Sequence, residues 1–106
     1  MPTIFLMIGK HSSENCPAFN AKSRKIAMEY YSKLDGLLKK HGVKKIGDWT
    51  VPYEHEEYVM FEAPSIDVFS KMMLEPEIMA INEFETFQTK IIVGSEEIMK
   101  MLGQVK

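Results

Sequence analysis

The first clear pattern in the chain is the run TIFLMIGK at residues 3–10, in which both alternating sets of positions are largely apolar. A strand with two apolar faces is typical of a sheet centre that is buried on both sides. From about 20 to 41, apolar side chains instead recur every three or four residues, with lysine and glutamate between them. This spacing predicts an amphipathic helix, which Asn20 caps at its start and Gly42 ends.

Two further strands are predicted at 43–54 and 58–63, separated by the acidic turn EHEE. Because Pro52 has no amide proton to donate, the first of them should be a bulged or edge strand. A second helix is predicted to begin after Ser65, and Pro76 stops it because proline cannot continue a helix.

The last two predicted elements are a strand and a short helix. After the irregular stretch EIMAIN, a fourth strand runs from about 83 to 93, and the apolar residues after Ser95 predict a terminal helix. The order is β-α-β-β-α-β plus a helix, in a single domain that spans residues 1–106. This order predicts an α+β, ferredoxin-like fold with a four-stranded antiparallel sheet, in which the third strand lies between the first and the second.

Both faces of the predicted sheet carry apolar side chains. Alternation would turn one set toward the two main helices: Ile4, Leu6, Ile8, Val59, Phe61 and Ala63. The other set would form an uncovered face: Phe5, Met7, Trp49, Val51, Tyr58, Met60, Phe87, Ile91 and Val93. Large open apolar faces are rare on monomers, so we expect two or more copies to pack these faces together. The alternative is that the terminal helix folds back over the face, although it is too short to cover four strands.

Composition narrows the classes of function. A net charge of −2 does not supply the basic face of a nucleic-acid binder. A single cysteine cannot form an intrachain disulfide, which indicates a reducing compartment. No apolar run approaches the ~20 residues that span a bilayer, and MPTIFLMIGK lacks the features of a signal peptide. We therefore expect a cytoplasmic protein with no nucleic-acid or membrane partner.

The length, the element order and the two-faced sheet resemble the dimeric α/β-barrel superfamily. The stretches HSSENCP, FEAPSIDVF and FETFQTKIIVGSEEIMKML are similar to a small ferredoxin-like family within it, near the stress-responsive and monooxygenase-like barrels. The resemblance covers nearly the whole chain and implies a homodimer with a small-molecule cavity beside each sheet. It implies no single activity, because the superfamily includes monooxygenases, isomerases, haem enzymes and ligand binders. The haem-degrading motif does not carry over, since SIDVFSKMML holds no histidine.

Polar side chains from distant segments are expected to meet at one rim of the sheet. The first and second strands end there, and the third and fourth strands begin there. The rim would gather the following residues: His11, Glu14, Cys16, Tyr53, His55, Tyr58 and Glu83 or Glu85. Alternation places His11 on the face of Phe5 and Met7, which is expected to point away from the helices. The loop KHSSENCPAFN should therefore border a pocket.

His11 is the candidate general acid or base, oriented by Glu14 or by a glutamate of the fourth strand. The residues expected to contact a ligand are Phe5, Met7, Cys16, Trp49, Tyr53, Tyr58 and Glu85. No cofactor is predicted. A metal site at His11, Glu14 and His55 is suggested only by a resemblance to the iron sites of the sulfur oxygenase members of the superfamily. The sequence spacing of these three residues does not match a known metal-binding motif.

Each candidate also has a structural interpretation. His11 can bond a backbone carbonyl, Cys16 can fill a small buried space, and Glu14 can remain solvated or pair with a lysine. The leading functional hypothesis is a small enzyme that acts on a partly apolar molecule. A non-catalytic ligand-binding or regulatory domain would use the same cavity. An RNA-binding module comes last, because the chain lacks sheet aromatics in a basic setting.

Overall fold

The computed structural model describes residues 2–105. Its elements are β1 (Thr3–Lys10), α1 (Ala21–His41), β2 (Lys44–Val51), β3 (Glu56–Ala63), α2 (Ile66–Met73), α3 (Pro76–Met79), β4 (Thr86–Ile92) and α4 (Ser95–Gly103). Two short 3-10 segments, η1 (Pro52–Glu54) and η2 (Ala80–Glu83), come before β3 and β4. All strand pairs are antiparallel, so the protein is an α+β fold built on one four-stranded antiparallel sheet.

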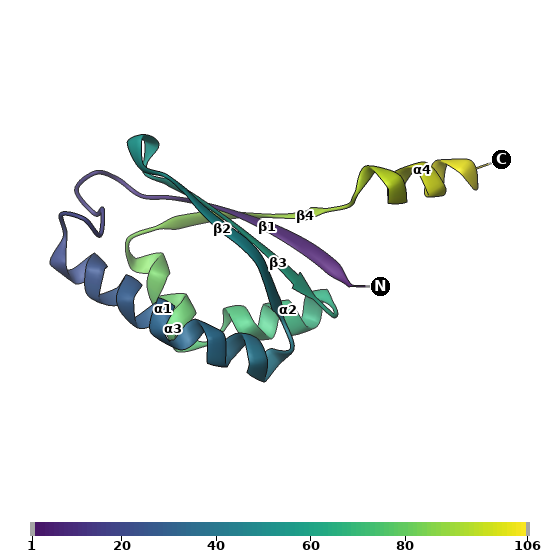
Figure 1. Cartoon of the computed structure of the whole chain (residues 1–106). Helices are drawn as coiled ribbons and strands as arrows, with labels where there is room; N and C mark the ends of the chain where they lie inside the picture. The colour runs from purple at the N-terminus through teal and green to yellow at the C-terminus, as the bar shows by residue number, and fades with distance from the viewer. Residues whose placement is uncertain (1, 106) are drawn as a thin grey trace.

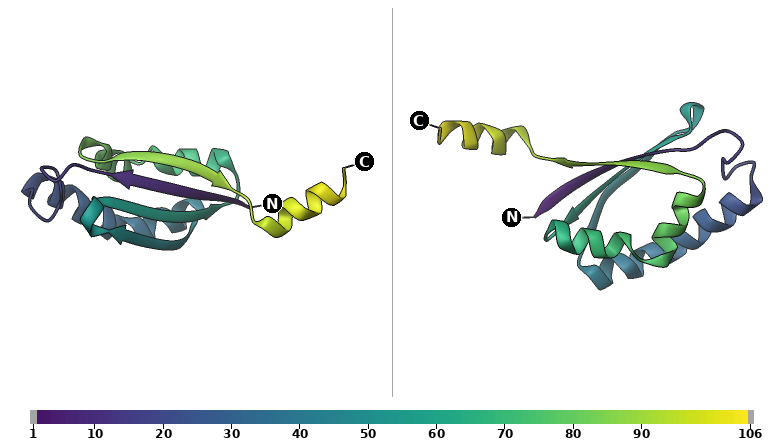
Figure 2. Two further views of the ribbon diagram at one scale, coloured as in Figure 1. Left: turned by 90° about the horizontal axis from the view of Figure 1, so that it is seen from above. Right: turned by 180° about the vertical axis from the view of Figure 1, so that it is seen from behind.

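The strands lie in the order β2-β3-β1-β4. The helices α1, α2 and α3 lie on one face of this sheet and leave the other face uncovered (Figures 1 and 2). We call these the helix face and the open face. No helix in the described part of the chain is long and apolar enough to cross a membrane.

Capping residues set the ends of α1 and the start of α2. The Ser23 N–H donates to the side chain of Asn20 at 3.0 Å, which supplies the N-cap of α1. Gly42 closes α1 with a φ of +67°, a conformation that favours glycine. Ser65 caps α2 by accepting from the Val68 N–H at 3.2 Å. The predicted caps at Asn20 and Gly42 and the predicted start of α2 after Ser65 are confirmed.

The predicted end of the second strand and the predicted irregular stretch after Pro76 are wrong, whereas α2 does end before Pro76, at Met73. β2 ends at Val51, and Pro52 opens η1 instead of lying inside the strand, although β2 is an edge strand with a bulge. Pro76 begins α3, where a missing amide proton costs nothing because the first helical amides have no partner. The stretch predicted to be irregular is therefore helical, and β4 starts only at Thr86.

The predicted faces of β1 are also wrong. Phe5 pairs with Phe61 and Met7 with Val59, and directly opposed residues share a face of a sheet. All four are buried, so Phe5 and Met7 lie on the helix face. The open face instead carries these half-buried residues of β1: Ile4, Leu6 and Ile8. Both sets of side chains in β1 are apolar, so alternation could not choose between the faces and only the pairing with β3 does.

The pairing between strands also assigns the residues of β2, β3 and β4 to the two faces of the sheet. Phe87 pairs with Gly9 and Ile91 with Phe5, so both lie on the helix face rather than on the open face as predicted. Val93 lies just beyond the end of β4. The remaining predicted residues do share the open face: Trp49, Val51, Tyr58 and Met60.

The hydrophobic core lies between the helix face and the helices. The largest fully buried side chains are Phe61, Leu34 and Met72. The Phe5 and Phe69 rings stack with centroids 3.9 Å apart, and Phe69 meets Phe61 at 5.8 Å. This aromatic cluster joins α2 to the two central strands.

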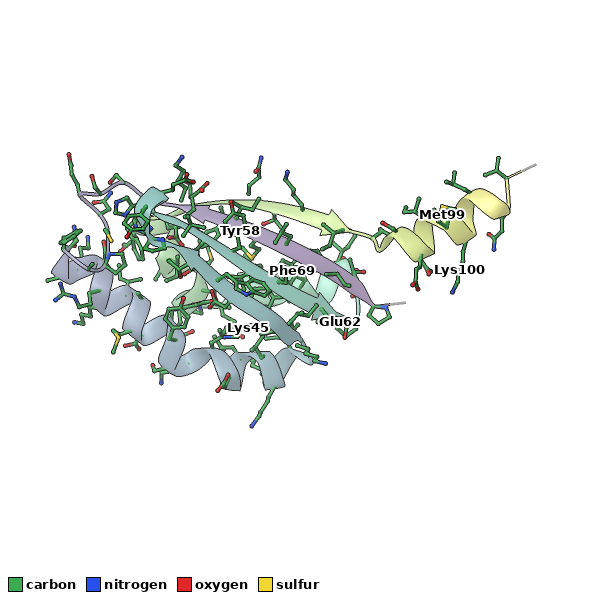
Figure 3. The ribbon with its side chains drawn as sticks, turned by 45° about the horizontal axis from the view of Figure 1, so that its top comes forward. Lys45, Tyr58, Glu62, Phe69, Met99 and Lys100 are labelled. Atoms are coloured by element: carbon green, nitrogen blue, oxygen red, sulfur yellow. The ribbon has the colours of Figure 1, made fainter. Side chains whose placement is uncertain are left out.

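α4 stands apart from this core. Figures 1 and 2 show it beyond the end of β4, and Figure 3 shows Met99 and Lys100 on it, away from Tyr58 and Phe69 of the main body. Its larger apolar side chains are exposed: Ile98, Met99, Met101 and Leu102. The Cα radius of gyration is 15.8 Å, whereas a compact domain of this length has one of about 13 Å. α4 therefore does not cover the open face of its own sheet.

Candidate functional site

A cavity of about 900 Å³ lies between the helix face of the sheet and the helices. Its apolar lining comes from strands, from α1 and from the segment before β4: Met7, Ala27, Val59, Phe61, Phe84 and Phe87. The cavity is built within one chain. It lies on the opposite side of the sheet from the one that the sequence predicted.

One end of the cavity holds a buried histidine–glutamate pair. His11 follows β1 and Glu85 precedes the neighbouring strand β4, so the two side chains meet. His11 Nδ1 donates to Glu85 Oε1 at 2.7 Å, and the side chains are only 11% and 5% exposed. The other ring nitrogen, Nε2, is buried and has no hydrogen-bond partner among the described residues. Because a neutral imidazole that donates from Nδ1 keeps a lone pair on Nε2, His11 holds an unused acceptor atom at this site.

The turn before β3 fixes the position of the His11 ring. The His11 N–H donates to the carbonyl oxygen of His55 at 3.1 Å. The two imidazole rings meet edge to face, with centroids 5.3 Å apart. His55 has a φ of +55° and is the one non-glycine residue with a positive φ in the described chain. This left-handed conformation is unusual for a side-chain-bearing residue, although histidine adopts it more often than most.

The loop between β1 and α1 is tied to the first turns of the helix. Arg24 Nε donates to the Pro17 carbonyl oxygen at 2.9 Å, and its Nη2 donates to that of Ala18 at 3.2 Å. Asn20 Nδ2 donates to the backbone carbonyl of Glu14 at 3.2 Å. Since these bonds join the loop to α1, they support the half-buried Cys16 at the mouth of the cavity.

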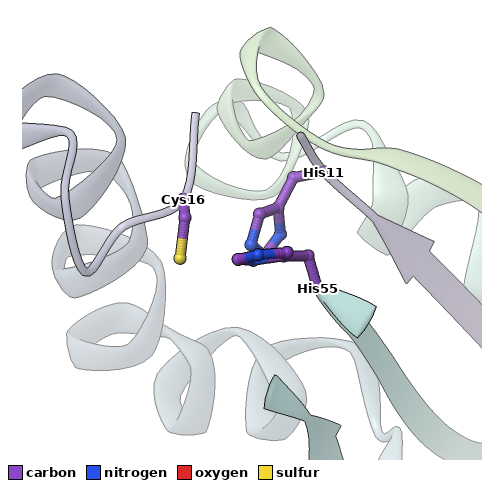
Figure 4. Close-up of side chains that lie close together, drawn as sticks. All are labelled: His11, Cys16 and His55. Carbon is purple, nitrogen blue, oxygen red and sulfur yellow. The ribbon is translucent and has the colours of Figure 1, made fainter. Parts of the chain in front are cut away.

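His11, Cys16 and His55 converge at this mouth (Figure 4). One possible ligand atom from each residue lies within 4.8 Å of the other two. Tyr53 also lines the mouth, although its side chain is almost fully exposed. Two histidines, a thiol and a carboxyl group thus occupy one end of a largely apolar cavity.

A second polar group lies along the cavity wall. The Tyr31 hydroxyl donates to Glu57 Oε2 at 2.9 Å. Burial, followed by the charge of Glu85, raises the pKa of Glu57 to about 7. Burial and the charge of Glu57 also raise the pKa values of Tyr30 and Tyr31. Among the described lining residues there is no lysine or arginine to balance the two glutamates.

The structure brings most of the predicted rim residues together. The rim residues that line the cavity are His11, Cys16, Tyr53, His55 and Glu85, and Met7, which was predicted to contact a ligand, lines it too. His11 does share a face with Met7, but this is the helix face, so its predicted direction away from the helices is wrong.

The other candidates lie elsewhere in the structure. Glu14 is exposed on the loop, and Glu85 rather than Glu14 bonds His11. Phe5 packs in the core, while Trp49 and Tyr58 pair on the open face.

Sequence reasoning missed the polar wall of the cavity: Tyr30, Tyr31 and Glu57. The signal for Glu57 was present in the sequence. Glu57 lies two residues before Val59 and four before Phe61 in the same strand, so all three side chains must share one face. Tyr30 lies in the stretch that predicts the amphipathic helix, and the structure places it on the cavity wall.

The sequence matches no protein-family model and no curated protein. The functional argument therefore depends on the geometry of the site.

The raised pKa of Glu57 predicts a pH-dependent stability. The pKa of Glu57 is about 7 in the folded protein, against 4.5 for an unperturbed glutamate, so the folded state binds this proton more tightly. Stability is therefore lost as the pH rises from about 4.5 through 7. We expect Glu57→Gln, which stays neutral, to match the wild type near pH 5 and to exceed its unfolding free energy by about 1–2 kcal/mol at pH 8, a value reduced for partial exposure. Urea unfolding at the two pH values tests this, and parallel pH profiles would contradict it.

Proposed function

We propose that this protein binds a small, partly apolar molecule in the cavity and that His11 exchanges a proton with it. The observation that carries this proposal is the buried Nε2 of His11, which has no hydrogen-bond partner in the described part of the chain and whose ring is oriented by the 2.7 Å bond to Glu85. A histidine held in one tautomer by a carboxylate is suited to general acid–base chemistry. Glu85 is a positioning residue in this proposal, because it acts through His11.

The volume and the lining of the cavity indicate which kind of small molecule it can bind. A volume of about 900 Å³ falls in the range of small-molecule sites, and such sites combine apolar walls with a few polar groups. Two carboxyl groups without a lysine or arginine among the described lining residues disfavour an anion. We therefore propose a neutral or positively charged molecule, with its polar end at His11.

A neutral fluorescent probe tests the binding proposal. N-phenyl-1-naphthylamine should bind the wild type saturably, with one probe per chain. Ala27 lines the cavity, so the bulky side chain of Ala27→Trp should weaken probe binding by at least about tenfold, because it occupies apolar volume. Ala21→Trp is the matched control, since Ala21 is exposed at the start of the same helix. Equal probe binding by all three proteins would refute the cavity as the site.

The proton-transfer role is tested with molecules that displace this probe. For a displacing molecule that the wild type converts, His11→Gln should still bind it but lose turnover by about 10²–10⁴-fold. Unchanged turnover in the variant would overturn the role of His11. If the wild type converts none of the displacing molecules, the proton-transfer part fails and the non-catalytic ligand-binding function remains.

We also propose that the chain is a ferredoxin-like domain that forms a homodimer of the dimeric α/β-barrel type. The strand order and the placement of three helices on one face support this arrangement. The support for a second copy is the open face with Leu6, Met60 and Trp49, together with the exposed apolar side chains of α4. A surface of this kind is uncommon on a monomer.

A further inference from the structure

We infer that His11, Cys16 and His55 form a binding site for a divalent transition-metal ion of the zinc class. Two imidazoles and one thiol are the ligand types that such borderline ions prefer. The three residues come from the end of β1, from the loop before α1 and from the turn before β3, so the fold rather than a local sequence motif assembles them. This inference goes beyond the proposed function.

The unpartnered nitrogen of His11 is the first argument. A metal-bound histidine characteristically donates its other ring N–H to a carboxylate or a carbonyl, which fixes the tautomer and orients the ring. Glu85 has this relation to His11 Nδ1, at 2.7 Å. The remaining Nε2 is buried and has no partner among the described residues, which is costly for a polar atom unless something binds there.

The second argument is the spacing of the cluster. The ligand atoms lie within 4.8 Å of one another, whereas tetrahedral zinc places such atoms about 3.3–3.6 Å apart. Closing the cluster therefore requires each atom to move by about 1 Å or less, which side-chain rotation can supply. Three protein ligands leave a fourth position for water or for a molecule in the cavity.

The charges around the cluster also favour a cation. Glu57 and Glu85 both line the cavity, and the described lining residues include no lysine or arginine. On binding, the Cys16 thiol would release one proton and coordinate as the thiolate, while both imidazoles coordinate in their neutral form. A net charge of +1 is thereby added beside the two glutamates.

The metal and the proton would use the same nitrogen, so one molecule cannot do both at once. In the metal-free protein Nε2 is available for proton exchange, and in the metal-bound protein the ion occupies it. Metal binding is measured with the ion alone, so either proposal can fail without the other.

Cobalt titration of chelator-treated protein tests the site. The wild type should bind one Co²⁺ per chain with the near-ultraviolet charge-transfer band of a cobalt–thiolate bond, and Zn²⁺ should displace it. Cys16→Ser should abolish the band and weaken binding at least about a hundredfold. His55→Gly should weaken binding similarly and still fold, because glycine readily accepts the φ of +55°. Glu85→Gln should keep the band but bind about 10–100-fold more weakly, as expected for a residue that orients a ligand.

The third histidine supplies the matched control. His41 lies at the end of α1, where its Nε2 pairs with Glu75 at 2.6 Å, and it is not part of the cluster. His41→Gln should bind cobalt like the wild type. The inference is overturned if the wild type gives no charge-transfer band, or if Cys16→Ser and His55→Gly, with circular dichroism spectra like that of the wild type, bind the ion with unchanged affinity.

Discussion

We expect the Phe69→Ala variant to lose about 3–5 kcal/mol of unfolding free energy, the cost typical of removing a large aromatic ring from a core. Phe69 is 4% exposed, stacks on Phe5 with an interplanar angle of 7° and also meets Phe61. Its removal leaves a cavity between α2 and both central strands. Because domains are stable by only about 5–15 kcal/mol, much of the total would be lost. Urea unfolding followed by circular dichroism measures this effect.

Phe19→Ala is the control for this prediction. Phe19 is 77% exposed, so the same change of residue should alter the unfolding free energy by less than about 0.5 kcal/mol. If the two variants were equally stable, the aromatic cluster would not be the centre of the core. If Phe69→Ala does not fold at all, the loss is larger than the total stability and the predicted magnitude is too small.

The helices and their caps could be predicted because their signals are local. Asn20, Gly42 and Ser65 act on backbone groups within a few residues, so the sequence around each one is sufficient. The position of α4 has no such signal. Its apolar stripe predicts a helix but not the surface that the stripe contacts, and within residues 2–105 no side chain of α4 is buried.

The face assignments show what alternation can and cannot determine. In β3 the set that holds Val59 and Phe61 was correctly predicted to face the helices, although the other set, with Tyr58 and Met60, is apolar too. In β1 both sets are apolar, and the choice depends on pairing across the sheet. That pairing is a property of the tertiary structure.

The same distinction applies to the site. Strand direction was enough to bring His11, His55 and Glu85 to one rim, because it depends only on the order of the elements. The direction of His11 depended on the face of β1, and that error placed the cavity on the wrong side of the sheet. The position of Cys16 beside the two histidines depends on the fold of its loop, which Arg24 holds through hydrogen bonds to the carbonyl oxygens of Pro17 and Ala18. The spacing of residues in the sequence does not predict these bonds.

The proposed dimer gives the second large expected effect. Leu6 lies on the open face in the central strand β1, opposite Met60 of β3. A dimer interface with two-fold symmetry uses the same patch twice, so Leu6→Lys would bury two unpaired charges. We expect the dissociation constant to rise at least about a hundredfold, because each unpaired charge costs several kcal/mol. Light scattering at micromolar concentration should give a dimer mass for the wild type and a monomer mass for this variant.

Leu74→Lys separates this effect from the general effect of an added charge. Leu74 follows α2 on the other side of the molecule and is 67% exposed, so its replacement should leave the dimer intact. A chain that ends at Gly94 would lack α4 and should dimerise more weakly if the exposed residues of α4 contact the second copy. A monomer mass for the wild type would contradict the dimer, while the cavity, which lies within one chain, would keep its probe binding. The open face and the cavity are therefore physically separate features, and each can be tested without the other.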